Sequence, residues 1–335
     1  MKKELGLLGL LLFLCLTVCG VELGKQLNAG ATFSTLELPR FLSATNLTNT
    51  ANLIGLFGIF SIGLGLVIIT GGIDLSVGSM CALVGVFLSL ALGDWHWAWP
   101  VAVFGAILIP VALGWAHGWL ITRMSMQPFI VTLCGLLIYR GIARTAAGDA
   151  TKGFTGAAGI EPLRALASGK LFGVPMSFVA LLVVGAVMWF LLHRSVYGRY
   201  LLAVGRNEEA ARFSGINTRL VIAGAYVIAG LLTGISGVMF AFYTNSVSPS
   251  NHGNFYELYG IAAAVLGGCS LRGGEGSIIG IIIGTTLLLV LQNLVNLLEI
   301  PSSLNFAVMG SVVLIGVLAD QFLQKRRLQT SGNRH

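Results

Sequence analysis

The sequence predicts an all-α fold, a polytopic membrane bundle of about ten transmembrane helices with both termini in the cytoplasm. Composition is the first reason: 56% of the 335 residues are hydrophobic and only 10% are charged, whereas a soluble domain carries about 25% charged residues. The mean hydropathy of +0.87 agrees with this. The apolar residues also gather in runs of about 20, the length that crosses a bilayer as a helix, without the alternation of a β-barrel.

The predicted spans follow one another within a single transmembrane domain over residues 1–335. The fifth is uncertain because it carries Arg140 and Arg144 near its end, and the eighth because it is short. The first could be mistaken for a signal peptide, but its apolar run is long for a signal and Val18 before Cys19 is bulky for a processing site. The approximate extents of the spans are 5–24, 50–70, 77–93, 98–120, 128–145, 174–193, 219–243, 257–270, 276–298 and 302–323.

The distribution of Lys and Arg predicts the orientation, because cytoplasmic loops retain positive charge. With the amino terminus inside, roughly 13 of the 20 Lys and Arg residues fall on the cytoplasmic side. Membrane topology therefore explains the net charge of +7, and no basic soluble face suggests nucleic-acid binding. The cytoplasmic set is Lys2, Lys3, Arg123, Arg194, Arg199, Arg206, Arg212, Arg219, Arg272, Lys325, Arg326, Arg327 and Arg334.

The sequence predicts no catalytic residue, no metal site and no cofactor. Its five cysteines lie in or beside apolar spans without a CxxC pair, so we expect small core residues. The motifs HExxH and GxSxG are absent, which argues against an intramembrane enzyme. GxxxxGK[ST] is absent too, so if ATP drives this protein, another polypeptide must bind the ATP.

The most informative soluble stretch is the basic loop 193–218, predicted to be cytoplasmic. Asn207 is a favourable N-cap, Glu208 and Glu209 place negative charge in the first turn, and Gly215 can end the helix. The predicted helix has about two turns and is too short to be stable alone in water, so it must dock on something. It could pack on the protein's own membrane face, or it could be a lever that docks in a partner and transmits motion to the spans.

Residues 71–80, GGIDLSVGSM, follow an uninterrupted apolar run. Gly71 and Gly72 weaken the helix that ends there, and Asp74 can cap a helix that begins at Leu75. A broken helix at membrane depth is tolerated only where its backbone is buried in protein or lines a wet cavity. A carboxylate near a span is a candidate functional residue. Asp74 can therefore be an interfacial cap, a functional residue, or both.

Gln292, Asn293 and Asn296 form a polar cluster in the ninth predicted span. Gln292 and Asn296 are four residues apart and share a helix face. Such side chains either hydrogen-bond to neighbouring helices or contact a polar permeant, and both alternatives stay open.

Three motifs occur in order along the chain: GGIDLSVGS at 71–79, NEEAARFSGI at 207–216 and GGCSLRGGEGS at 267–277. With these motifs the chain resembles, nearly end to end, the permease subunits of the ribose-type ATP-binding-cassette importers, which move monosaccharides such as ribose, xylose, arabinose and galactose. One departure is Tyr259, which stands where the family usually has an acidic residue and leaves the substrate range or a partner contact in doubt.

The resemblance implies a multi-pass protein of the bacterial inner membrane, surrounded by membrane lipid. Its partners would be a separate ATPase, a periplasmic sugar-binding protein, and a second permease chain, identical or paralogous. The implied coupling residues, which would contact the ATPase, are Arg206, Asn207, Glu208, Glu209, Ala210, Ala211 and Gly215. The candidate translocation-path residues are Gly71, Gly72, Asp74, Ser76, Gln292, Asn293 and Asn296.

The alternative is a stand-alone, ion-coupled secondary transporter. Its spans would carry acidic or histidine residues for proton or Na⁺ coupling. Asp74 is the main candidate and His117 a weaker one, which is fewer than proton relays usually have. The sequence identifies neither the sugar nor whether the two permease chains are identical.

Overall fold

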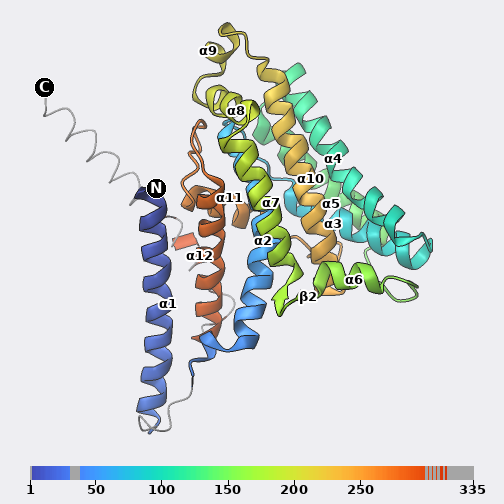
Figure 1. Ribbon diagram of the computed structural model, residues 1–335. Helices are drawn as coiled ribbons and strands as arrows, with labels where there is room; N and C mark the ends of the chain where they lie inside the picture. The colour runs from blue at the N-terminus through green and yellow to red at the C-terminus, as the bar shows by residue number, and fades with distance from the viewer. Residues whose placement is uncertain are drawn as a thin grey trace, which may run out of the picture. The chain divides into compact units, whose positions relative to one another are not determined.

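The computed structural model describes residues 2–30 and 38–298, and Figure 1 shows their helices. Eight of the described helices are long and apolar enough to cross a membrane, so the predicted all-α polytopic membrane fold is confirmed. The chain divides into two compact units: unit 1 is Met1–Leu47 with Thr286–His335, and unit 2 is Thr48–Thr285. A single domain over 1–335 stays a prediction. Isolated positions are also described at residues 301, 304, 307, 310, 311 and 314.

The eight long helices correspond to eight of the ten predicted spans. The eighth predicted span, 257–270, is instead the 11-residue helix α11 (Tyr256–Leu266), which is too short to cross a bilayer unaided. The tenth, 302–323, lies largely outside the described residues. The long helices are α1 (Lys2–Asn28), α2 (Ala44–Ile69), α3 (Val77–Ser89, extended by the π-turn η2, Leu90–Asp94), α4 (Trp99–Arg123), α5 (Pro128–Ala147), α7 (Met176–His193), α10 (Thr218–Thr244) and α12 (Ile278–Leu297).

Short elements occupy the loops between the long helices, and the helix α9 among them was predicted from the sequence. Neither α8 nor α6 has a counterpart among the predicted elements, because each is amphipathic and lies outside the apolar runs. The short elements are η1 (Arg40–Leu42), β1 (Lys152–Gly153), α6 (Glu161–Ser168), β2 (Lys170–Leu171), β3 (Val174–Pro175), α8 (Val196–Arg206), α9 (Glu208–Phe213) and β4 (Ser246–Val247).

Unit 1 has a small apolar core in which Val18, Phe41 and Val290 are buried. Two side chains fasten the backbone of Phe41: the Glu22 carboxylate accepts its N–H at 3.0 Å, and the Asn46 amide donates to its carbonyl at 2.9 Å. Because the buried Glu22 accepts this N–H, its carboxylate does not remain without a hydrogen bond in the apolar core.

In unit 2, residues 54–69 of α2 are buried without interruption. Leu56, Ile59 and Phe60 are all 0% exposed, as expected for a helix that is apolar on every side. Glycines let α10 approach α4 closely: a Cβ atom at Gly114 would overlap the Tyr226 carbonyl. Small residues at helix contacts are the usual way in which membrane helices pack.

The two ends of unit 2 are tied by different contacts. At one end β1 pairs antiparallel with β4, with Lys152 opposite Val247. At the other end the Gly274 N–H donates to the Ile69 carbonyl at 2.8 Å. Figure 1 shows α8 and α9 at one end of unit 2, and α6 with β2 at the other. The α8 and α9 end carries the loop that the charge distribution predicts to be cytoplasmic.

The outward faces of α4, α5 and α7 are apolar. Phe104, Trp115, Leu137 and Phe190 are each more than 60% exposed, and Cys134 on α5 is also exposed, contrary to its prediction as a core residue. Large apolar side chains cover these faces because lipid or another protein, rather than water, surrounds them.

Candidate functional site

The predicted interruption after the apolar run 50–70 is present, since α2 ends at Ile69 and α3 begins at Val77. Gly71 has a φ of +85°, a left-handed conformation that glycine adopts without steric cost. The Thr132 hydroxyl of α5 donates to the Ile73 carbonyl at 3.1 Å. Gly72 and Asp74 are buried, while Gly71 is exposed and lines a cavity. The break thus lies partly in protein and partly at a cavity, the two conditions under which non-helical backbone is tolerated at membrane depth.

The predicted role of Asp74 as the cap of a helix beginning at Leu75 is wrong. The N-cap residue of α3 is Ser76. Asp74 Oδ1 instead accepts the Ser76 N–H at 2.8 Å and the Ser76 hydroxyl at 2.6 Å. The short side chain of Asp reaches its own backbone two residues on, which favours a turn over a cap at this position.

Asp74 is the centre of a buried polar cluster in unit 2. It is 2% exposed and interacts electrostatically with His117, Tyr139 and Tyr226. His117 Nε2 lies 2.7 Å from the Tyr139 hydroxyl. Within the described residues, His117 Nδ1 and the Tyr226 hydroxyl have no hydrogen-bond partner. This Asp74 cluster, made of these four residues, can therefore offer polar atoms to a polar solute.

A second polar group, the Arg140 junction, joins α5 to the loop between α10 and α11. Arg140 Nη1 donates to the carbonyls of Pro249 at 3.0 Å and His252 at 2.6 Å. The buried Glu257 carboxylate interacts with Arg140 and accepts a hydrogen bond from the Gly78 backbone. A Cβ atom at Gly78 would overlap that carboxylate. The junction therefore fastens the first turn of α11 to the first turn of α3.

The N-termini of α3 and of the short helix α11 thus meet inside unit 2. The positive end of α3 faces the Glu257 carboxylate, which favours a negative charge at that point. Discontinuous helices with their termini at a polar centre are a common plan for solute sites in transporters. The Arg140 junction and the Asp74 cluster form one candidate translocation site, because Asp74 also interacts electrostatically with Glu257.

Aromatic rings cover one side of this site. The Phe57 ring lies 5.1 Å from Phe240, 4.9 Å from Tyr256 and 5.5 Å from Tyr259, centroid to centroid. Tyr259, which stands where the family usually has an acidic residue, adds a ring to this group. At this position the chain has an aromatic surface in place of a carboxylate.

The end of α8, directly before the second motif, lies close to the segments that carry the first and third motifs. A Cβ atom at Gly205 would overlap the Ile69 carbonyl and the Gly274 N–H, and one at Gly273 would lie 2.9 Å from Gly71 N. The end of α8 therefore touches both the segment 70–76 and the glycine-rich segment before α12. These backbones approach so closely only because the positions are glycines.

The predicted short helix after Asn207 is present as α9, and its role in coupling stays a prediction. Asn207 caps it, with Oδ1 accepting the Ala210 N–H at 2.9 Å, and Gly215 follows it with a φ of +85°. Glu208 points toward the protein, since its carboxylate accepts the Thr218 hydroxyl at 3.1 Å, and Ala211 is buried. Of the predicted coupling residues only Ala211 is buried, and the others are exposed, so the helix keeps a free face.

The free face of α9 includes a residue that the sequence analysis missed. Phe213 is 79% exposed, and the Arg212 guanidinium lies 5.9 Å from its ring centroid. A large apolar side chain so exposed on a polar helix suggests a protein contact. Its place inside the NEEAARFSGI motif could have indicated it.

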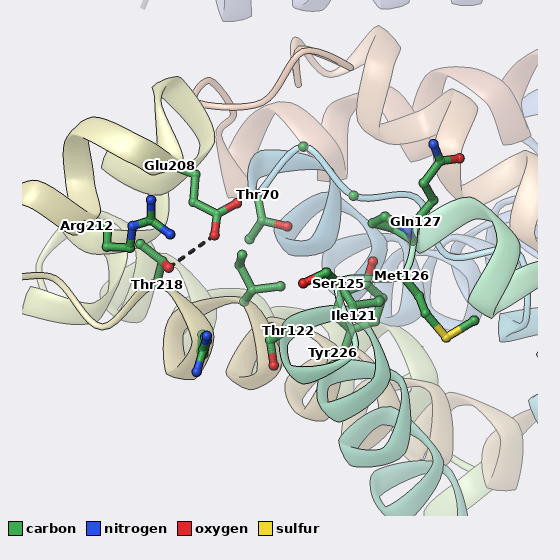
Figure 2. A pocket seen from close by; sticks show the side chains of 15 residues that line it. Thr70, Ile121, Thr122, Ser125, Met126, Gln127, Glu208, Arg212, Thr218 and Tyr226 are labelled. Carbon is green, nitrogen blue, oxygen red and sulfur yellow. Dashed lines mark hydrogen bonds between the residues drawn. The ribbon is translucent and has the colours of Figure 1, made fainter.

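A cavity of about 460 Å³ separates α9 from the start of α5. Figure 2 shows Glu208, Arg212 and Thr218 on one side of it and Ser125, Met126 and Gln127 on the other. The cavity brings predicted coupling and path residues together, because Gly71 and Gly72 also line it. The lining consists of Thr70, Gly71, Gly72, Ile121, Thr122, Ser125, Met126, Gln127, Pro128, Glu208, Arg212, Thr218, Arg219, Ile222 and Tyr226.

The polar cluster of the ninth predicted span belongs to unit 1. The Asn293 amide donates to Asn46 Oδ1 at 2.9 Å, which is a bond between neighbouring helices, one of the two alternatives. Gln292 is partly buried and Asn296 exposed. A contact of these residues with a permeant stays a prediction.

A protein-family model for the permease component of branched-chain amino acid transport systems matches residues 46–318. The chain belongs to this permease family. The resemblance to ribose-type permeases is also confirmed: the ribose import permease protein RbsC of Escherichia coli (strain K12) is 37% identical over 292 residues, 87% of this chain and 89% of that protein. The permease is thus a multi-pass membrane transport subunit and not an enzyme.

Other relatives of this permease have names that refer to other sugars. The D-allose transport system permease protein AlsC of Escherichia coli (strain K12) is 29% identical over 296 residues, 88% of this chain and 89% of that protein. The fructose import permease protein FruF of Bifidobacterium longum (strain NCC 2705) is 32% identical over 253 residues, 76% of this chain and 71% of that protein. No solved structure matches the permease.

Proposed function

We propose that this permease is the membrane-spanning subunit of an ATP-binding-cassette importer in the bacterial inner membrane. It receives a simple sugar of the ribose, xylose, arabinose or galactose kind from a periplasmic binding protein and releases it into the cytoplasm. Relatives named as importers of ribose, D-allose and fructose support a sugar as the permeant. The lack of a GxxxxGK[ST] motif in the sequence supports a separate ATPase.

The observation that carries this proposal is the position of α9. Its six residues end in the exposed Phe213, and the preceding helix α8 touches the break between α2 and α3 through Gly205. A helix this short depends on docking for stability. An ATPase bound to its free face would therefore be mechanically connected to the candidate translocation site.

The proposed mechanism follows these contacts. ATP binding closes the ATPase dimer and pushes α9 laterally. The Glu208–Thr218 hydrogen bond passes the motion to α10, and the contact of Gly205 with the Ile69 carbonyl passes it to the segment 70–76. The Asp74 cluster and the Arg140 junction then change their arrangement, and the central path switches from outside-open to inside-open.

Purification from native membranes in mild detergent, followed by reconstitution, tests the proposal. We expect an ATPase with two phosphate-binding loops to co-purify, and a second permease-like chain beside it would indicate a heterodimer. Proteoliposomes of the complex should take up labelled ribose, xylose, arabinose or galactose only with ATP and a binding protein. Leucine is the control solute. Uptake by this chain alone, driven by an ion gradient, would favour the secondary transporter instead.

Charge reversal on the free face of α9 tests the lever. We expect Glu209→Lys to leave membrane insertion intact and to weaken ATPase docking, because Glu209 is exposed and no described contact holds it. Glu208→Lys should have an additional effect, since it also removes the bond to Thr218. Binding-protein-stimulated ATP turnover is the measurement, and normal turnover in both variants would exclude the lever.

Replacing the carboxylate of Asp74 tests the candidate path. We expect Asp74→Asn to reduce the rate of sugar uptake more than the amount of protein inserted in the membrane. The Asp74 side chain is buried and interacts electrostatically with His117, Tyr139 and Tyr226. Uptake is compared at equal expression. If it is unchanged, Asp74 only fixes the turn at Ser76.

A further inference from the structure

The cavity beside α9 is lined by two arginines that form no ion pair. The ion pairs of the described residues are Arg144 with Asp149 and Lys152 with Asp94, and neither involves Arg212 or Arg219. Both arginines line the cavity. One carboxylate, that of Glu208, lines it as well and accepts the Thr218 hydroxyl. The lining therefore has a net charge of one positive unit and favours an anion.

Two long helices begin at the cavity wall. The 27-residue helix α10 starts at Thr218, and the 20-residue helix α5 starts at Pro128. At α10 the Asn217 side chain accepts the Leu220 N–H at 3.3 Å, whereas Gln127, the N-cap residue of α5, makes no side-chain capping bond and precedes a proline without an N–H. Helix N-termini carry unpaired N–H groups and a partial positive charge, and they bind phosphate and carboxylate groups.

An independent observation is the hydroxyl of Tyr226. Tyr226 lines the cavity and is 0% exposed, and within the described residues its hydroxyl has no partner. A Cβ atom on Gly72 would lie 2.5 Å from this hydroxyl, and Gly72 lines the cavity too. A buried hydroxyl without a partner costs free energy, and a polar ligand in the cavity would supply that partner.

We propose that this cavity binds a phosphorylated monosaccharide from the cytoplasm. The phosphate would lie near Arg212, Arg219 and the two helix starts, while sugar hydroxyls would meet Glu208, Gln127 and Tyr226. The volume of about 460 Å³ is within the range of small-molecule sites, about 300–1,000 Å³. The inference rests on the proposed function, which places this end of the permease in the cytoplasm and makes a sugar the permeant.

The proposed ligand would be the product of the reaction that follows import. An imported sugar becomes a phosphate ester when a kinase transfers the terminal phosphoryl group of ATP to a sugar hydroxyl and leaves ADP. The ester would bridge Arg212 on α9, Arg219 on α10 and the segment 70–72. It would thereby oppose the movement of α9, because a ligand that binds one conformation shifts the population toward it. Import would slow when the product of the next reaction accumulates.

Calorimetric titration of the purified permease in phosphatidylcholine nanodiscs tests the site, with ribose 5-phosphate as the probe and ribose and inorganic phosphate as comparators. We expect the ester to bind more tightly than either comparator. Arg219→Gln should weaken its binding by about tenfold, the loss expected for one charge-assisted hydrogen bond. Tyr226→Phe should weaken binding without a change of charge. The matched control is Arg199→Gln, an exposed arginine of α8 outside the cavity lining, which should bind the ester normally.

Three results would overturn the site. The first is no binding of ribose 5-phosphate, and the second is equally weakened binding in Arg199→Gln and Arg219→Gln. The third is binding that disappears when phosphatidylglycerol replaces phosphatidylcholine, because the arginines would then bind a lipid headgroup. ATP-driven uptake into vesicles keeps this result separate from the proposed function. Normal sugar uptake without ester binding rejects the site alone, whereas ester binding without any sugar uptake rejects the importer.

Discussion

Arg140→Gln is expected to destabilise unit 2 and to abolish uptake. The change leaves the carbonyls of Pro249 and His252 without their donor and the buried Glu257 without its positive partner. Leaving a buried hydrogen-bonding group without its partner typically costs about 1–3 kcal/mol. The thermal midpoint in detergent and the uptake rate in proteoliposomes are the measurements.

A double variant makes this prediction specific. If the cost of Arg140→Gln comes from the uncompensated charge of Glu257, adding Glu257→Gln should recover part of the lost stability, because neither charge then remains unpaired. Uptake should stay low, since α11 is no longer fastened to α3. Additive losses in the double variant would contradict the pairing of these two residues.

Arg144→Gln is the matched control, one helical turn further along α5. Arg144 pairs with Asp149 at 2.7 Å, but both side chains are more than half exposed. Solvent screens such a pair, so its loss should leave stability and uptake nearly unchanged. A large effect of Arg144→Gln would mean that any arginine at this end of α5 is needed, whatever its contacts.

Local signals in the sequence were sufficient for α9 and for the break after α2. Asn207 and Gly215 determine the ends of α9 through hydrogen bonds to residues at most four positions away. Gly71 ends α2 because only a residue that tolerates a positive φ fits there. Hydropathy likewise predicts the long helices, since a single-residue property averaged over a window requires no knowledge of contacts.

The candidate site could not be predicted in the same way, because its contacts join residues far apart in the chain. Arg140 and Pro249 are 109 residues apart, and Gly71, Gly205 and Gly273 come from three separate segments of the chain. Arg140 carried a usable signal, since an ionisable residue inside an apolar span is a functional candidate. In the sequence, however, Arg140 reads equally well as a sign that the fifth predicted span ends early. Glu257 gave a weaker signal, because it stands at the first position of the predicted span 257–270, where a charged residue is ordinary.

The start of α3 shows how a local rule fails. Asp74 has a strong preference for helix caps, yet Ser76 occupies that position. The same oxygen of Asp74 can accept the N–H and the hydroxyl of Ser76 together, so the turn provides two bonds where a cap provides one. The carboxylate is thereby kept in the protein interior beside His117 and Tyr226.

Phe213→Ala is expected to weaken ATPase binding with little effect on the fold of the permease. Phe213 is 79% exposed and lies on the free face of α9, so its truncation removes few contacts within the chain. Truncation of an aromatic anchor at an interface typically costs about 2 kcal/mol or more, which corresponds to about 30-fold in affinity. The measurements are the dissociation constant of the ATPase and the stimulated ATP turnover.

Phe172→Ala is the control, because Phe172 is 97% exposed in the turn between β2 and β3, at the end of unit 2 opposite α9 (Figure 1). It removes an equally large apolar surface, yet ATPase binding should not change. If both variants weaken the complex alike, loss of exposed apolar surface in general is the cause, and Phe213 is not a specific anchor. If neither does, the ATPase binds through the charged residues of α9, and Glu209→Lys should then have the larger effect.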